Sequence, residues 1–196
     1  MRERLPLATI HDAVLEFLRG RDDAVLYGAQ AVNAYVDEAR MTQDVDILSP
    51  RAAELAEEIR AYLNERFQIA VRVRKVREGI GYRVYQLQKP KNRHLVDVRA
   101  VEQLPPTQRV DEVLVLTPPE LIASKIAAWT SRRGKPKAGT DWRDLAELLL
   151  TFPDLKSEDG PVADCLRAGN APESALAAWK DIVSQEILPE DEDAGY

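Results

Sequence analysis

Three aspartates lie inside apolar stretches of the sequence, and their spacing suits a divalent metal ion. Asp44 and Asp46 are separated by one valine, and Asp97 lies between two valines further along the chain. On a strand, residues i and i+2 project from the same face, so Asp44 and Asp46 would lie side by side. Neighbouring half-buried carboxylates repel each other unless a cation lies between them, and Mg²⁺ binds carboxylates together with substrate phosphates. With Asp97 as a third ligand, two ions about 3.5–4 Å apart could bind.

An Asp-x-Asp pair alone is weak evidence, because most such pairs are solvent-facing strand residues. The surrounding elements favour the metal site. A short apolar strand is predicted over 24–27, with a turn at Gly28, a helix over 29–38 and the Asp-x-Asp strand over 43–48. Asp97 lies in another predicted strand, over 95–101. Two histidines and one cysteine are too few for a typical zinc site, so a hard cation held by carboxylates is expected.

The other predicted elements are helices and strands in the first part of the chain and helices alone afterwards, which favours an α+β fold. They are helices over 9–19 and 49–66, strands over 68–77 and 82–88 joined by a turn at 78–81, and helices over 117–130, 141–150, 161–168 and 172–185. Ser49 and Pro50 are expected to start the second of these helices, and Thr117 and Glu120 are expected to form a capping box.

Length and composition fit a globular chain with three parts. The 196 residues are 45% hydrophobic and 31% charged, which is ordinary for a folded protein. We predict an α/β core over 1–116, a helical part over 117–188 and an acidic tail over 189–196. No apolar run approaches the roughly 20 residues of a membrane span, so no membrane partner is expected. With a single cysteine no internal disulfide can form, and a cytoplasmic location is expected.

The charge is unevenly distributed along the chain. The net charge is −6, yet residues 72–94 hold eight Lys or Arg and one Glu, and residues 131–137 hold four more Lys or Arg. Such segregation is consistent with a basic surface that binds RNA phosphates. Two solvated, Lys/Arg-rich segments without a partner would give the same pattern, so both interpretations stay open.

Four motifs, in this order, resemble the nucleotidyltransferase signature of the DNA polymerase beta-like superfamily. They are Gly28-Ala29-Gln30-Ala31, Arg40-x-Thr42-x-Asp44-Val45-Asp46, Lys125 in LIASKIAAW, and Arg143-Asp144-Leu145. The sequence is most similar to the AbiEii-type nucleotidyltransferases, which include toxins of bacterial toxin–antitoxin systems, and the resemblance covers about residues 8–152. It implies a polymerase beta-like core with a mixed β-sheet and flanking helices, followed by a helical C-terminal part.

The resemblance implies magnesium-dependent transfer of a nucleoside monophosphate from a nucleoside triphosphate to an acceptor hydroxyl. Asp44 and Asp46 would bind two Mg²⁺ ions and the triphosphate, and Asp97 would be a further ligand or the base. Lys125 would neutralise charge on the triphosphate, and Asp144 would lie near the site. The acceptor would be RNA, at the 3′ end of tRNA, or a hydroxyl side chain of a protein. If the protein is a toxin, a cognate antitoxin would be a further partner.

Nucleotide binding is expected at the glycine turn and in the segment before the Asp-x-Asp strand. The resemblance assigns the β- and γ-phosphates to the backbone amides at Gly28, Ala29 and Gln30. Arg40 could contact the triphosphate, or together with Thr42 it could only shape the approach to the strand. Members of the group usually carry a second glycine and a Ser or Thr in this turn, where Ala29 and Gln30 stand here. A catalytically degenerate binding module is therefore the alternative to an enzyme.

Lys125 and Asp144 also have simpler explanations. Lys125 lies on an otherwise apolar helix and could extend its ammonium group to solvent. Asp144 could pair with its neighbour Arg143 or favour the start of its helix. The identity of these two residues alone does not distinguish a structural role from contact with a substrate.

Overall fold

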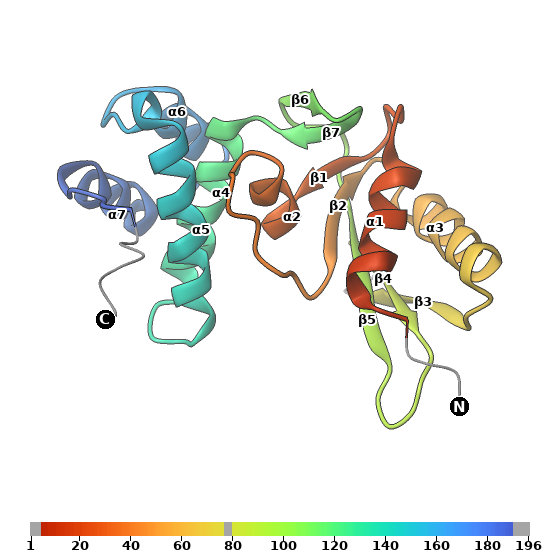
Figure 1. Cartoon of the computed structure of the whole chain (residues 1–196). Helices are drawn as coiled ribbons and strands as arrows, with labels where there is room; N and C mark the ends of the chain where they lie inside the picture. The colour runs from red at the N-terminus through yellow and green to blue at the C-terminus, as the bar shows by residue number, and fades with distance from the viewer. Residues whose placement is uncertain (1–4, 77–79, 190–196) are drawn as a thin grey trace. The chain divides into compact units, whose positions relative to one another are not determined.

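The computed structural model describes residues 5–76 and 80–189, which form two compact units (Figure 1). The first comprises the described residues up to Ala34 together with Glu38–Leu116, and the second comprises Tyr35–Asp37 together with the described residues from Thr117 onward. Three predicted elements lie partly outside the described residues. They are the strand over 68–77 at residue 77, the turn over 78–81 at residues 78–79, and the acidic tail at residues 190–196.

A seven-stranded mixed sheet forms the centre of the first unit. Its strands are β1 (Val25–Tyr27), β2 (Val45–Ser49), β3 (Val71–Val76), β4 (Gly81–Gln86), β5 (Arg93–Ala100), β6 (Thr107–Val110) and β7 (Val113–Leu116). Their order across the sheet is β3-β4-β5-β2-β1-β7-β6. β2 runs parallel to β5 and β1 runs parallel to β7, whereas the other neighbours are antiparallel. β2, which carries Asp46, therefore lies next to β5, the strand that carries Asp97. The strand predicted over 43–48 begins only at Val45, so Asp44 precedes it.

Three helices belong to this unit: α1 (Leu7–Leu18), α2 (Gly28–Asn33) and α3 (Ala52–Phe67). α1 and α3 pack against each other, and α3 contacts β3, β4 and β5 (Figure 1). The apolar residues that alternate along the central strands form the core, and Val45, Ile47, Val96 and Val98 are fully buried. The short helix α2 contacts β1 and β2, which places its first turn beside the Asp-x-Asp strand.

Helices form the second unit. They are α4 (Pro118–Ser131), α5 (Lys137–Thr151), the 3₁₀ turn η2 (Pro153–Leu155), α6 (Pro161–Ala168) and α7 (Glu173–Ser184). α4 packs against α5, α6 and α7. Leu121, Leu145 and Trp179 project into the buried core from three of these helices, as an apolar stripe at helical spacing requires. Within the described ranges of the chain, no helix is long and apolar enough to cross a membrane.

Two predicted helices differ from the structure at their ends. The helix predicted over 29–38 ends at Asn33, because the Asn33 side chain bonds to both backbone groups of Arg40, at 2.8 and 3.1 Å. Such local bonds from an Asn side chain compete with helix continuation. The helix predicted from Ser49 begins only at Ala52, since the Ser49 hydroxyl accepts a bond from the N–H two residues on and does not cap the helix.

Other boundaries were also mispredicted. α5 begins at Lys137 rather than at 141. Thr117 precedes α4, but its side chain makes no capping bond, so the predicted capping box is wrong. The hairpin of β6 and β7 was absent from the prediction. Its turn residues Asp111 and Glu112 have φ values of +46° and +67°, a conformation that Gly or Asn usually signals in a sequence.

Candidate active site

A row of polar residues crosses the sheet of the first unit, strand by strand. Tyr27 on β1 is the cross-strand partner of Asp46 on β2, and Asp46 is the partner of Asp97 on β5. Asp97 is in turn the partner of Arg83 on β4, and Arg83 is the partner of Arg74 on β3. Directly paired residues lie next to each other on one face of a sheet. The fold therefore brings Asp46 and Asp97 together, although they are far apart in the sequence.

Gly28 lies directly against the Asp46 carboxylate. Its φ of +73° is in the left-handed region, and a Cβ atom at this position would come within 2.2 Å of Asp46 Oδ2. Glycine is required here for two reasons, since it adopts positive φ without strain and leaves room for the carboxylate. The glycine turn at the start of α2 and the Asp-x-Asp strand thus form one tightly packed structure.

Asp44 precedes β2 and is held by a histidine from the neighbouring strand. His94 Nδ1 lies 2.9 Å from Asp44 Oδ2, and His94 Nε2 lies 3.1 Å from the Val96 carbonyl oxygen. The imidazole also packs against the Tyr85 ring, with 5.0 Å between centroids. No local sequence pattern predicts this contact, because His94 becomes a neighbour of Asp44 only through the parallel pairing of β2 with β5.

Tyr27 borders the carboxylates at the other end of the row. Burial, followed by the negative charge of Asp46, raises the pKa of the Tyr27 phenol above its usual range. The Arg99 guanidinium lies over the Tyr27 ring, 5.5 Å from its centroid. Tyr27 therefore remains neutral and can donate a hydrogen bond beside the carboxylates. Tyr27 is absent from the predicted site residues, since a tyrosine at the end of an apolar strand is usually part of the core.

A hydrogen-bond network fixes the segment that leads to Asp44. Gln30 Nε2 donates to Thr42 Oγ1 at 3.0 Å, and Thr42 Oγ1 lies 3.4 Å from His11 Nδ1. Asn33 Nδ2 also contacts Gln30 Oε1, at 3.3 Å. Thr42 and His11 are buried, and burial lowers the pKa of His11. Gln30 and Thr42 thus connect the glycine turn to the loop before the Asp-x-Asp strand.

The donor set fits Mg²⁺, but two of the three aspartates bond to neighbouring side chains. Carboxylate oxygens are the ligands that this hard cation prefers, and Asp46 and Asp97 are register partners. Asp44 bonds to His94, and Asp97 bonds to Arg83 with 3.2 Å between Asp97 Oδ2 and Arg83 Nε. Over residues 5–76 and 80–189, no three Asp, Glu, His or Cys side chains converge on one point. Binding of metal by all three aspartates would therefore need one or both of these contacts to open.

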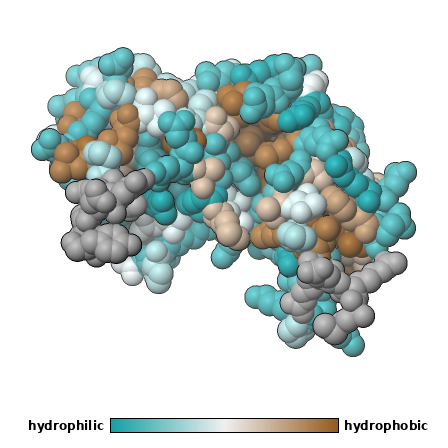
Figure 2. Space-filling model, viewed as in Figure 1, coloured by the Kyte–Doolittle hydropathy of each residue, from teal (hydrophilic) through white to brown (hydrophobic). Residues whose placement is uncertain are grey.

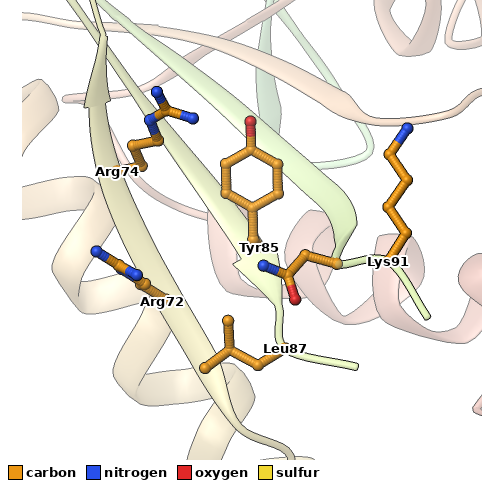
Figure 3. A pocket seen from close by; sticks show the side chains of 6 residues that line it. Arg72, Arg74, Tyr85, Leu87 and Lys91 are labelled. Carbon is orange, nitrogen blue, oxygen red and sulfur yellow. The ribbon is translucent and has the colours of Figure 1, made fainter. Parts of the chain in front are cut away.

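An open, basic hollow lies at the β3 end of the polar row (Figure 3). Its volume is about 620 Å³, and it is lined by Arg72, Arg74, Tyr85, Leu87, Lys91 and Asn92. Arg72 and Arg74 project from β3, and Tyr85 projects between them and Lys91. The tip of the hairpin between β4 and β5 carries hydrophilic side chains (Figure 2). We refer to these six lining residues as the basic hollow.

Lys125 and Asp144 form a buried ion pair in the second unit. Lys125 Nζ lies 2.6 Å from Asp144 Oδ2, and the two side chains are 8% and 2% exposed. Lys125 is on α4 and Asp144 is on α5, so the pair joins the two helices that pack together. The alternative in which Lys125 extends to solvent is therefore wrong. The Lys and the Arg-Asp-Leu motif are one structural feature rather than two.

Removal of this lysine should destabilise the protein. Lys125→Met would leave the Asp144 carboxylate buried without its ammonium partner, and we expect the free energy of unfolding to fall by about 3–5 kcal/mol. Chemical denaturation followed by circular dichroism measures this change. Arg143→Met is the matched control, because Arg143 is exposed on the same helix and its loss should cost less than about 0.5 kcal/mol. Equal stability of the two variants would contradict a structural role for the buried pair.

Solved structures share this fold. The polyadenylate synthase of Megavirus aligns with 79% of this chain at a TM-score of 0.60 and 13% identity, and this chain spans about a third (33%) of that enzyme's length. An H. pylori protein described as a nucleotidyltransferase aligns with 92% of this chain, over 82% of its own length, at a TM-score of 0.60 and 14% identity. At these identities the likenesses show the fold alone. They confirm the predicted polymerase beta-like α+β architecture.

Sequence comparison shows the family. A search of curated protein sequences found no significant match. The family described as nucleotidyl transferase AbiEii toxin, of type IV toxin–antitoxin systems, matches residues 12–191. This match covers nearly the whole chain and includes the glycine turn, the three aspartates and the buried Lys125–Asp144 pair. The chain is therefore a member of the AbiEii nucleotidyltransferase toxin family.

Proposed function

We propose that the protein moves a nucleoside monophosphate from a nucleoside triphosphate to an acceptor hydroxyl in a magnesium-dependent reaction. The observation that carries this proposal is the pairing of Asp46 with Asp97 across β2 and β5, with Gly28 packed against Asp46. Family membership supports it. A carboxylate pair beside a glycine turn can hold a cation and the phosphates it neutralises at one place.

In this proposal Asp44, Asp46 and Asp97 hold two Mg²⁺ ions. Bound Mg²⁺ would neutralise the triphosphate and lower the pKa of the acceptor hydroxyl. Asp97, as an alternative to metal binding, would accept the proton from that hydroxyl. Lys125 and Asp144 would support the reaction by stabilising the helical unit through their buried ion pair.

The turn residues would bind the nucleotide through their backbones. We assign the β- and γ-phosphates to the amides of Gly28, Ala29 and Gln30, because the Gln30 side chain is engaged by Thr42. Arg40 is exposed in part and would reach the triphosphate from the loop before β2. Thr42 would act indirectly, by fixing that loop.

The main alternative is a binding module without turnover, and the Ala29-Gln30 pair in the turn motivates it. The two functions differ in pyrophosphate release. The enzyme should release pyrophosphate when Mg²⁺, a nucleoside triphosphate and an acceptor are all present. Magnesium-dependent nucleotide binding without pyrophosphate release, for every nucleotide and for both RNA and protein acceptors, would favour the binding module.

RNA is the acceptor that the basic hollow favours, and the 3′ end of tRNA would supply the hydroxyl. Among the described residues, Arg72, Arg74 and Lys91 make no ion pair with an acidic side chain. Uncompensated cations beside an aromatic ring suit a phosphate backbone with an adjacent base. The hollow also lies at one end of the row that contains Asp97 and Asp46. A hydroxyl side chain of a protein is the second candidate acceptor.

Loss of two arginines from the hollow should weaken RNA binding. For Arg72→Gln combined with Arg74→Gln, we expect at least about tenfold lower affinity for a single-stranded RNA oligonucleotide. The slope of log affinity against log salt should flatten by about 1.4, since each lost contact removes ~0.7 for single strands. Fluorescence anisotropy at several salt concentrations measures both quantities. Arg19→Gln combined with Arg60→Gln removes the same charge from the residue that follows α1 and from α3. Indistinguishable behaviour of the two double variants would exclude the hollow as the RNA site.

We also propose that the transfer reaction is toxic to a bacterial host and that a cognate antitoxin neutralises it, as family membership suggests. Expression of the protein alone should slow growth, and expression together with the neighbouring gene should restore it. Normal growth in both cases would contradict toxicity in the host tested.

A further inference from the structure

Arg83 occupies an unusual position between a cation and an anion. Its cross-strand partner on β3 is Arg74, and its partner on β5 is Asp97. Like charges placed directly opposite on neighbouring strands repel, and opposite charges attract. Arg83 bonds to Asp97, with 3.2 Å between Arg83 Nε and Asp97 Oδ2. The Tyr85 hydroxyl and the Asp97 carboxylate both raise the pKa of Arg83.

The Asp97 carboxylate cannot serve Arg83 and a divalent cation equally well. Arg83 is its partner in the structure, and the guanidinium places a positive charge beside Asp97 Oδ2. The side chains are 44% exposed for Arg83 and 23% exposed for Asp97, so the ion pair is moderate in strength and can exchange. Asp46, one strand away, is the cross-strand partner of Asp97 and packs against Gly28.

We infer that Arg83 is a built-in counter-ion for Asp97 that competes with a divalent cation and so sets the metal affinity of the site. The inference rests on the proposed function, because it takes Asp97 as a metal ligand. Arg83 is a positioning residue in this account, since it acts through Asp97.

Release of Arg83 would also affect the basic hollow. Arg83 already lies beside Arg74 and Tyr85, which line the hollow, and a cation at Asp97 would repel the guanidinium and take away the carboxylate that offsets its charge. The hollow would gain a positive charge when the metal binds. Metal and a phosphate-bearing ligand would therefore strengthen each other's binding, and this linkage would be equal in both directions.

Titration calorimetry with Mn²⁺ on the full chain tests the inference without any reaction. Arg83→Gln should bind Mn²⁺ about threefold to fivefold more tightly than the wild type, which is the range that a half-exposed ion pair supports. Arg83→Lys keeps the positive charge and should bind nearly as the wild type does. Arg74→Gln removes a charge in the same row without touching Asp97, and its change should be clearly smaller than that of Arg83→Gln.

The outcomes separate this inference from the proposed function. If the wild type and Arg83→Gln bind Mn²⁺ with the same affinity, Arg83 does not act as a counter-ion, although the metal site exists. The same conclusion follows if Arg83→Gln and Arg74→Gln increase the Mn²⁺ affinity equally. Weaker binding by Arg83→Gln would overturn it as well. Failure of both the wild type and Arg83→Gln to bind Mn²⁺ would instead remove the metal site, and the proposed function with it.

Discussion

Asp46→Asn is expected to reduce magnesium-dependent nucleotidyl transfer by about a thousandfold or more, comparable to the loss of a group that stabilises transition-state charge. Asparagine has the same shape, so the packing against Gly28 is retained while the negative charge is lost. Asp46 also lies in the polar row, between Tyr27 and Asp97. Its carboxylate therefore adjoins both the Tyr27 phenol and the second carboxylate of the proposed metal site. Initial rates of pyrophosphate release at saturating Mg²⁺ measure the effect.

The control for this variant is Asp12→Asn, because Asp12 is exposed on α1 and lies outside the polar row. It should keep the wild-type rate. Thermal unfolding of Asp46→Asn should show a melting temperature no lower than that of the wild type, since the substitution removes repulsion between Asp46 and Asp97. An Asp46→Asn protein that is folded and retains most of its rate would contradict the site.

Gly28→Ala is expected to be nearly as damaging, for a steric reason. The added methyl group would lie 2.2 Å from Asp46 Oδ2 and 2.9 Å from Asp46 Cβ, distances that no relaxed structure allows. Either the turn or the carboxylate must move, and we expect transfer to fall by about a hundredfold, as when reacting groups are displaced by about 1 Å. The variant should also lose stability, because alanine at a φ of +73° is strained by about 1–2 kcal/mol.

Gly20→Ala is the control that separates backbone strain from the steric clash with Asp46. Gly20 has a φ of +72° and no atom within 4 Å of an added Cβ, and it belongs to the same unit. It should show the backbone strain alone, with a similar cost of about 1–2 kcal/mol and an unchanged transfer rate. If both glycine variants lost the same activity, the contact between Gly28 and Asp46 would have no special role.

The sequence was sufficient to predict the strand, glycine turn and aspartates, because these signals are local. Period-two alternation identified β2, and the single acid in a β-branched run identified Asp97 as a strand residue. The contacts that tune the site could not be predicted. Arg83 and His94 reach Asp97 and Asp44 through the order β4-β5-β2, and no local pattern specifies which strands become neighbours.

The absence of a local signal also explains why the β6–β7 hairpin and the end of α2 were mispredicted. The β6–β7 hairpin has a turn made of Asp111 and Glu112, so the glycine or asparagine that marks most such turns is missing. The helix after Gly28 was predicted to be longer because helical periodicity continues beyond Asn33. In the structure the Asn33 side chain bonds to a residue seven positions later. Helix propensity, which depends on the residues within a helix, does not predict such a contact.

Transfer of label from each α-labelled nucleoside triphosphate to total bacterial RNA, with Mg²⁺, tests nucleotidyl transfer and its acceptor in one experiment. We expect a labelled band of tRNA size for the wild type with at least one of the nucleotides, and no label with Asp46→Asn. A labelled protein band in place of RNA would retain the transferase and change its acceptor to a hydroxyl side chain. Absence of label on RNA and protein with all four nucleotides, from a folded wild-type protein that binds nucleotide, would contradict nucleotidyl transfer.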